Sequence, residues 1–284
     1  MKNLLILLFA VSHFAFGQNV EPFQLYNKKG KKIKTKKFFK KIDEGQIILF
    51  GELHNNPIAH WMQLKTTQVM NENKTISLGA EMLEANNQEQ LDAYLKGEIT
   101  QQELDSTASL WMNYKTDYKP LVDHAKENNL NFIATNVPRK YASHVYRNGL
   151  ESLDTHLTVV EKNWIAPLPI AFDPELPNYK AMLTMMSDHA NPNFPKAQAI
   201  KDATMAHFIY QEYAKNQNQF IHFNGDYHSK DFEGIYWYLK RQDESLNIIT
   251  ISTVEQSDVN TLNEEFVGQA DYILVVDKDM TKTY

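Results

Sequence analysis

Acidic and imidazole side chains follow short apolar runs at widely separated places in this sequence. The run in "ILFGELH" ends in a carboxylate, Glu52, and an imidazole, His54. A similar stretch, "HFNGDYH", ends in the imidazole of His228, 174 residues after His54. Glu81 follows another run in "LGAEMLE". Histidine and carboxylate side chains bind divalent metals and are also common general acids and bases. These four residues predict either a metal site or an acid–base set around a small molecule.

Both histidines end a G-x-x-H segment. Glycine at the end of a strand lets the backbone turn sharply or approach a ligand closely, so the histidine that follows can face a cleft. One such segment is a weak signal, because each polar residue alone could be an ordinary helix cap. Its repetition at two strand ends favours a shared site. The residues that we expect to support this cleft are Gly51, Asn136, Gln198, Asp202, Gly225 and Asp226.

The apolar runs predict the strands that bring these residues together. They are almost continuously apolar, which is typical of a parallel sheet covered on both faces. Ligands bind such sheets beyond the carboxyl ends of the strands, where the loops converge. We expect strands at Gln46–Phe50, Ile76–Ala80, Asn131–Thr135, Phe220–Phe223, Asn247–Ile251 and Tyr272–Val276.

Helical patterns lie between several of these runs, at Ile58–Asn71, Lys119–Asn128 and Asp231–Arg241. The alternation predicts an α/β fold with a central, mainly parallel sheet flanked by helices. Two longer stretches, at about residues 84–118 and 141–213, are interpreted as helical insertions that form a smaller subdomain. We expect one α/β domain over residues 18–284.

The first 17 residues have the layout of a secretory signal peptide, with a lysine, an apolar run and small residues before Gln18. The chain has no cysteine, which excludes a thiolate nucleophile and a zinc–thiolate site. It also excludes a lipid anchor on an N-terminal cysteine. We therefore expect an exported, soluble protein, periplasmic or secreted.

One segment departs from the acidic balance of the chain. The formal net charge is −6, yet residues 28–41, "KKGKKIKTKKFFKK", contain nine lysines. Such a segment either keeps the edge of the sheet soluble or forms a patch for an anionic partner, such as a membrane surface or ligand carboxylates. The export signal and the negative total argue against nucleic acid.

The motifs together resemble those of the ChaN-like haem-binding uptake family, which belongs with the Tiki, TraB and erythromycin-esterase-like proteins. The resemblance rests on "LFGELHNNPIAH", "LGAEMLEANNQEQLDAYLKGEI", "YKPLVDHAKENNLNFIATNVPRK", "AQAIKDATMA" and "GDYHSKDFEGI". It implies export, haem as ligand with a tyrosine on the iron, pairing of two copies around haem, and an outer-membrane haem receptor as partner. The chain departs from many family members in having no lipidation cysteine, and Lys201 stands where arginine is common.

A haem site needs an axial ligand, an apolar slot and cations for the propionates. A tyrosinate ligand is favoured by a neighbouring donor or cation that lowers its pKa. The candidates on this ground are Tyr227 beside His228, Tyr210 near His207, and Tyr141 near Arg139. A stripe in "YKAMLTMMSDH" either packs in the core or forms a cofactor wall, and it consists of Met182, Met185, Met186 and His189.

Two main functions remain open. The first is an exported haem-binding protein of a bacterial iron or haem acquisition system. The second is a metal-dependent hydrolase, a Tiki-like peptidase or an esterase, with Glu52 or Glu81 as general base and the two G-x-x-H histidines on the metal. An esterase-like enzyme without metal is a third reading, and the absence of G-x-S-x-G argues against a serine nucleophile. We expect structural or solvent-facing roles for His60, His124, His156 and His222.

Overall fold

The computed structural model describes residues 21–185 and 191–284, in which seven strands form one sheet. Their order is β1-β7-β6-β2-β5-β3-β4. Strands β2 to β7 run parallel, and β1 pairs antiparallel with β7 at one edge. The prediction of a mainly parallel α/β sheet is confirmed. The strands are β1 (Phe23–Asn27), β2 (Ile47–Glu52), β3 (Ile76–Glu84), β4 (Asn131–Asn136), β5 (Gln219–Gly225), β6 (Ile248–Gln256) and β7 (Tyr272–Asp277).

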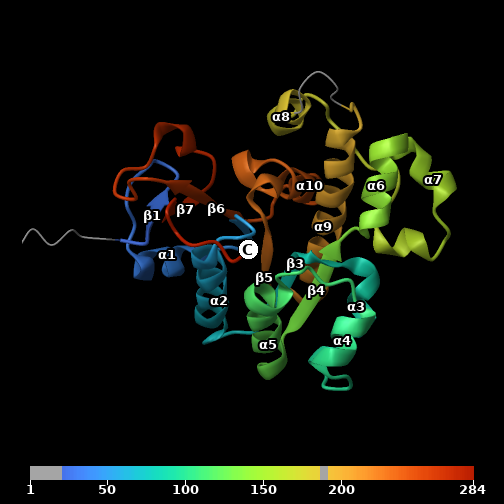
Figure 1. The fold of residues 1–284 in the computed structure, drawn as a ribbon, viewed down its shortest axis with the longest axis horizontal. Coiled ribbons are helices and arrows are strands. Elements are labelled where there is room, and N and C mark those ends of the chain that lie inside the picture. Colours follow the sequence, from blue (N-terminus) through green and yellow to red (C-terminus); the bar gives the residue numbers. More distant parts are fainter. Residues whose placement is uncertain (1–20, 186–190) are drawn as a thin grey trace, which may run out of the picture.

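Helices lie on both faces of this sheet (Figure 1). In the described part of the chain the α-helices are α1 (Thr35–Ile42), α2 (Pro57–Asn71), α3 (Gln88–Leu95), α4 (Gln101–Thr107), α5 (Lys119–Glu127), α6 (Arg139–Asn148), α7 (Leu153–His156), α8 (Pro177–Met185), α9 (Phe194–Asn216) and α10 (Ile235–Gln242). A short π-helix, Tyr114–Tyr118, precedes α5.

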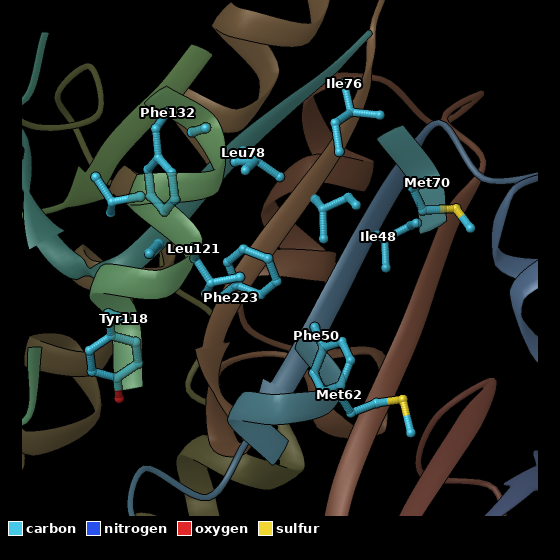
Figure 2. Packing of buried hydrophobic residues seen from close by; sticks show 14 of the residues in the cluster. Ile48, Phe50, Met62, Met70, Ile76, Leu78, Tyr118, Leu121, Phe132 and Phe223 are labelled. Carbon is cyan, nitrogen blue, oxygen red and sulfur yellow. The ribbon is translucent and has the colours of Figure 1, made fainter. Parts of the chain in front are cut away.

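One face of the sheet packs against α2 and α5. Phe50 of β2 and Phe223 of β5 belong to the same buried cluster as Met62 of α2 and Leu121 of α5 (Figure 2). Successive residues of a strand point to opposite faces, so Leu49 of β2 packs on the other side. Burying each such side chain contributes about 1.5–3 kcal/mol. Because both faces of the sheet are buried, successive residues of these strands are apolar and do not alternate with polar ones.

The other face of the sheet packs against α9 and α10. Leu49 and Phe220 share a buried cluster with Ile209 of α9 and Leu239 of α10. Helix α9 is long, and it carries Asp202 towards the carboxyl ends of the strands.

The two helical insertions contribute to different clusters. Leu91 of α3 and Leu104 of α4 join the core on the α5 face. Val145 of α6 and Leu153 of α7 pack instead against Ile200 of α9. In Figure 1, α6 lies beside α9 and α7 lies on the outer side of α6, away from α3 and α4. The helical part is therefore divided between the two faces of the sheet.

Several element boundaries differ from the expectation, and strand β6 continues to Gln256 instead of ending at Ile251. Strand β3 continues to Glu84, with an irregular register after Ala80, so Glu81 lies inside the strand. Helix α10 begins at Ile235 instead of Asp231, because Gly234 has a φ of 55° and Asp231 a φ of 60°. Positive φ values interrupt a right-handed helix.

The predicted signal peptide, residues 1–17, lies outside the described residues, and so do Met186 and His189 of the methionine stripe. Within residues 21–185 and 191–284, every helix is too short or too polar to span a bilayer.

Candidate functional site

A pocket of about 880 Å³ opens at the carboxyl ends of β2, β3 and β5. Glu52, the last residue of β2, lies opposite Gly225, the last residue of β5. The volume is within the usual range of small-molecule sites. The sequence-predicted residues that line the pocket are Glu52, His54, Glu81, Asn136, Arg139, Gln198, Gly225, Asp226, Tyr227 and His228. Residues from five separate parts of the chain therefore meet here.

Glu52 is buried at the centre of a hydrogen-bond network. Tyr118 donates to its Oε1 at 2.7 Å, and Gln63 donates to its Oε2 at 2.5 Å. Nδ1 of His54 lies 2.9 Å from Oε1, and Nδ1 of His60 lies 3.5 Å from Oε2. Burial alone would raise the pKa of Glu52, but the two histidines outweigh burial and hold this pKa at about 2. Glu52 is therefore ionised at neutral pH.

His54 is oriented by this carboxylate. Because Nδ1 is engaged by Glu52, the second ring nitrogen, Nε2, is left for the pocket. Trp111 and the imidazole pack edge to face, with ring centroids 4.9 Å apart. Burial lowers the pKa of His54, but the hydrogen bond with Glu52 and the charge of Glu81 raise it above its ordinary value. The pair can accept, hold and return a proton at Nε2.

His228 is held between two carboxylates. Its Nε2 lies 3.1 Å from Oε1 of Glu81, and its Nδ1 lies 2.5 Å from Oδ1 of Asp202. Tyr179 donates to the other oxygen of Asp202, and the backbone N–H of Gly225 donates to Glu81. Burial opposes the charge on His228, but Glu81 and Asp202 raise its pKa to about 9. His228 is therefore an imidazolium at neutral pH.

The predicted metal ligands meet as ion pairs and not as a ligand set. Both ring nitrogens of His228 face carboxylates, and Glu52 already accepts hydrogen bonds on both oxygens. In residues 21–185 and 191–284, no group of three or more histidine, aspartate or glutamate side chains is arranged to hold a metal ion. Glu52 and His54 form one cluster, and Glu81 and His228 form another.

Two residues predicted to support the cleft do so from outside it. Asp202 reaches the pocket only through His228. A Cβ on Gly51 would stand 2.6 Å from Oδ1 of Asp226, so glycine lets these loops approach. Asp226 accepts a hydrogen bond from Ser252, and burial raises its pKa to about 6.

Several site residues were not predicted. His60 was expected to be structural or solvent-facing, but it is buried against Glu52 and donates to the backbone oxygen of His54. The helix start at Asn56–Pro57 would have placed His60 and Gln63 on one face. Tyr118 comes from the π-helix of the first insertion, and no sequence signal pointed to it.

Of the three tyrosines predicted as haem ligands, one lines the pocket and two lie elsewhere. Tyr227 lines it, but its phenol donates to the backbone oxygen of Asn178 at 2.9 Å. Tyr210 packs with the α9–α10 cluster and Tyr141 is buried in the α6–α7 cluster, so neither lines the pocket. Tyr284, which was not predicted, lines it as well.

Besides Glu84 and Asn55, the rest of the lining holds cations and apolar side chains. Arg139, Lys201 and Lys230 contribute positive charge. The apolar part is formed by Trp111, Val137, Met182 and Phe194. Such a mixture suits a ligand that has a large apolar body and carries negative groups.

A family model described as haem-binding uptake, Tiki superfamily, ChaN matches residues 38–239. The chain belongs to this family. The resemblance seen in the sequence motifs is thereby confirmed. The part that matches the ChaN family contains all the pocket residues named above except Tyr284. A comparison with curated proteins finds no match.

Solved structures share the fold of this ChaN family member. ChaN of Campylobacter jejuni, which binds haem cofacially, is 18% identical with a TM-score of 0.67 over 90% of this chain and 97% of that one. A succinoglycan biosynthesis protein is 12% identical with a TM-score of 0.54 over 90% and 94%. The erythromycin esterase EreC is 11% identical with a TM-score of 0.48 over 90% and 83%. At these identities the likeness to the first two structures concerns the fold.

Proposed function

We propose that this ChaN family member binds haem in the pocket at the carboxyl ends of β2, β3 and β5. The observation that carries the proposal is the lining itself, which places three cations beside an apolar wall in one pocket of about 880 Å³. Haem is a flat apolar ring with two carboxylate side chains, and it needs both kinds of contact. Trp111 and Phe194 would contact the ring, and Arg139, Lys201 and Lys230 would hold the propionates.

We propose that the iron ligand is one of the two tyrosines that line the pocket. The phenol of Tyr284 has no hydrogen-bond partner in the described part of the chain, whereas that of Tyr227 already donates to Asn178. Burial, with the charges of Glu52 and Asp117, raises the pKa of Tyr284. Ferric iron favours a tyrosinate, so binding must release that proton. His54 and Glu52 supply a base beside the same pocket.

We propose that the protein acts outside the cytoplasm, in a bacterial iron or haem acquisition system with an outer-membrane haem receptor. The signal-peptide layout of residues 1–17 and the uptake family support this proposal. Cofacial haem in Campylobacter jejuni ChaN suggests pairing of two copies here. The mass of the haem-loaded protein in solution tests the pairing.

Titration with ferric haemin, followed by the absorption spectrum, tests haem binding. We expect a saturable high-spin tyrosinate spectrum near one haem per chain, which is lost in Tyr284→Phe or Tyr227→Phe. The matched controls are Tyr210→Phe and Tyr141→Phe, which change tyrosines outside the pocket. Retention of the spectrum in both pocket variants, or its loss in a control variant, would contradict the ligand assignment. No saturable binding would contradict the function.

Hydrolysis at the same pocket is the second candidate, and the Glu52–His54 pair favours it. A histidine with one nitrogen on a carboxylate and the other facing a cleft is the arrangement of a general base. We expect His54→Ala to abolish hydrolysis of a panel of peptides and esters, assayed with and without added Mn²⁺, Co²⁺ or Zn²⁺. Identical rates in the wild type and in this variant would eliminate the candidate.

A further inference from the structure

The lysine-rich segment, residues 28–41, lies on the surface at the β1 edge of the sheet. It forms the turn after β1 and the whole of α1 except Ile42 (Figure 1). Lys41 is half-buried, and the other eight lysines are exposed: Lys28, Lys29, Lys31, Lys32, Lys34, Lys36, Lys37 and Lys40. The segment has no acidic residue and carries +9, so the rest of the chain carries −15. We call these eight exposed lysines the basic edge.

Within residues 21–185 and 191–284, the eight lysines of the basic edge have no carboxylate partner. Of the nine lysines only Lys41 has a carboxylate partner, Glu44, in the described part of the chain. The nearby Asp43 is paired with Lys74. Lys28 lies over the ring of Phe232, and Lys32 donates to Asn260. Unpaired like charges this close in sequence repel one another, so they weaken the fold unless an external anion offsets them.

The shape of the basic edge favours an extended anion over a small one. The lysines project from a turn and from the outer side of α1, whose inner side is fixed in the core by Phe38 and Ile42. The small pocket beside Lys40 also contains Asp43 and Lys74, which pair with each other. A small carboxylate would therefore find few free donors there. A broad, dense array of negative groups can contact many of these lysines at once.

We propose that the basic edge docks this protein on an anionic lipid surface. Phe38 and Ile42 of α1 are buried and Phe39 packs half-buried against the same core, so docking is electrostatic and does not insert a helix into the bilayer. Each lysine near an anionic membrane adds to the attraction, and salt screens it.

Flotation with lipid vesicles tests the docking. The full chain is mixed with vesicles of phosphatidylcholine alone, or of equal parts phosphatidylcholine and phosphatidylglycerol. The test variant is Lys36→Gln/Lys37→Gln/Lys40→Gln, on the outer side of α1. The matched control is Lys96→Gln/Lys215→Gln/Lys278→Gln, which removes the same charge from exposed lysines elsewhere. All three chains share residues 1–20, so the comparison isolates the lysines.

We expect binding to the phosphatidylglycerol vesicles at about 0.1 M salt and much weaker binding at about 1 M, as the screening length falls from about 10 Å to about 3 Å. The test variant should bind roughly 100-fold more weakly than the control variant. A triple arginine variant at the same positions should bind as the wild type does. Equal binding of the two glutamine variants, equal binding to both vesicles, or tighter binding to RNA than to vesicles would overturn the proposal.

Discussion

Nε2 of His54 lies 2.7 Å from the point that a Cβ on Gly225 would occupy. That distance is shorter than any ordinary contact of a Cβ. The end of β5 thus carries a glycine because the imidazole at the end of β2 lies directly over it. Oε2 of Glu81 lies 3.4 Å from the same point. The two G-x-x-H segments therefore meet in space, where the histidine of the first packs on the glycine of the second.

Gly225→Ala should displace His54 from the pocket. Forcing a methyl group into a packed site costs about 1–3 kcal/mol, so the free energy of unfolding should fall by that amount. Denaturant unfolding measures the cost. The variant His54→Ala provides the control, because in that background the alanine at 225 meets less obstruction and should cost less. Equal costs in the two backgrounds would show that the imidazole does not occupy this place.

Glu52→Gln should destabilise the fold and lower the pKa of His54. The amide cannot offset the charge of His54 and His60, and removing one partner of a buried ion pair costs about 3 kcal/mol. The pKa of His54 is followed by NMR as a function of pH. Glu84→Gln is the comparison, because Glu84 also lines the pocket but has no hydrogen bond with His54. If both variants left the pKa of His54 unchanged, Glu52 would not be the group that raises it.

The stability of the fold should depend on the ionisation of His228. Its pKa is raised from 6.5 to about 9 in the folded chain. The resulting stabilisation is fully present below about pH 6.5 and is lost as the pH rises through about 9. We expect a loss of up to about 3 kcal/mol over that range. Unfolding at several pH values measures it, and His228→Gln should remove this pH dependence. An NMR titration of the His228 ring near its ordinary pKa would contradict the assignment.

Gln88→Ala should expose the free edge of β4. The side-chain amide of Gln88 donates to the backbone oxygen of Phe132 and accepts from the N–H of Ala134, as a neighbouring strand would. Unpaired edge groups promote pairing between chains. Light scattering should therefore show concentration-dependent association of this variant. Gln101→Ala, which removes a side-chain amide that donates to Asp105, is the control and should behave as the wild type does.

The sheet could be predicted because burial on both faces leaves nearly continuous apolar runs. The edge strand β1 was not predicted as such, since Phe23–Asn27 is short and only partly apolar. It is held by pairing with β7, which is more than 240 residues away in sequence. The extension of β3 past Ala80 was missed because Glu81 looks like the start of a loop. A buried carboxylate is stable there because His228 pairs with it and the backbone N–H of Gly225 donates to it.

The candidate site could be predicted mainly for residues that end strands, and Gln198 and Asp202 were added from one face of a predicted helix. Those positions converge in any open parallel sheet, so Glu52, His54, Glu81 and His228 could be grouped from sequence. The partners supplied by insertions depend on how those helices pack, as for Tyr118 and Tyr179. Tyr210 was a poor candidate because the face of α9 that carries it was not known from sequence. The metal prediction did not anticipate that both nitrogens of His228 would face carboxylates.

Paramagnetic broadening of the histidine signals by ferric haemin tests the central claim most directly, because it locates the iron. Zinc protoporphyrin, which is diamagnetic, controls for binding without broadening. We expect the ring signals of His54 and His228, which line the pocket, to broaden with ferric haemin only, while those of His124 and His207, which do not line it, stay sharp. Sharp His54 signals on the haem-loaded protein, or selective broadening of His207, would contradict haem binding in this pocket.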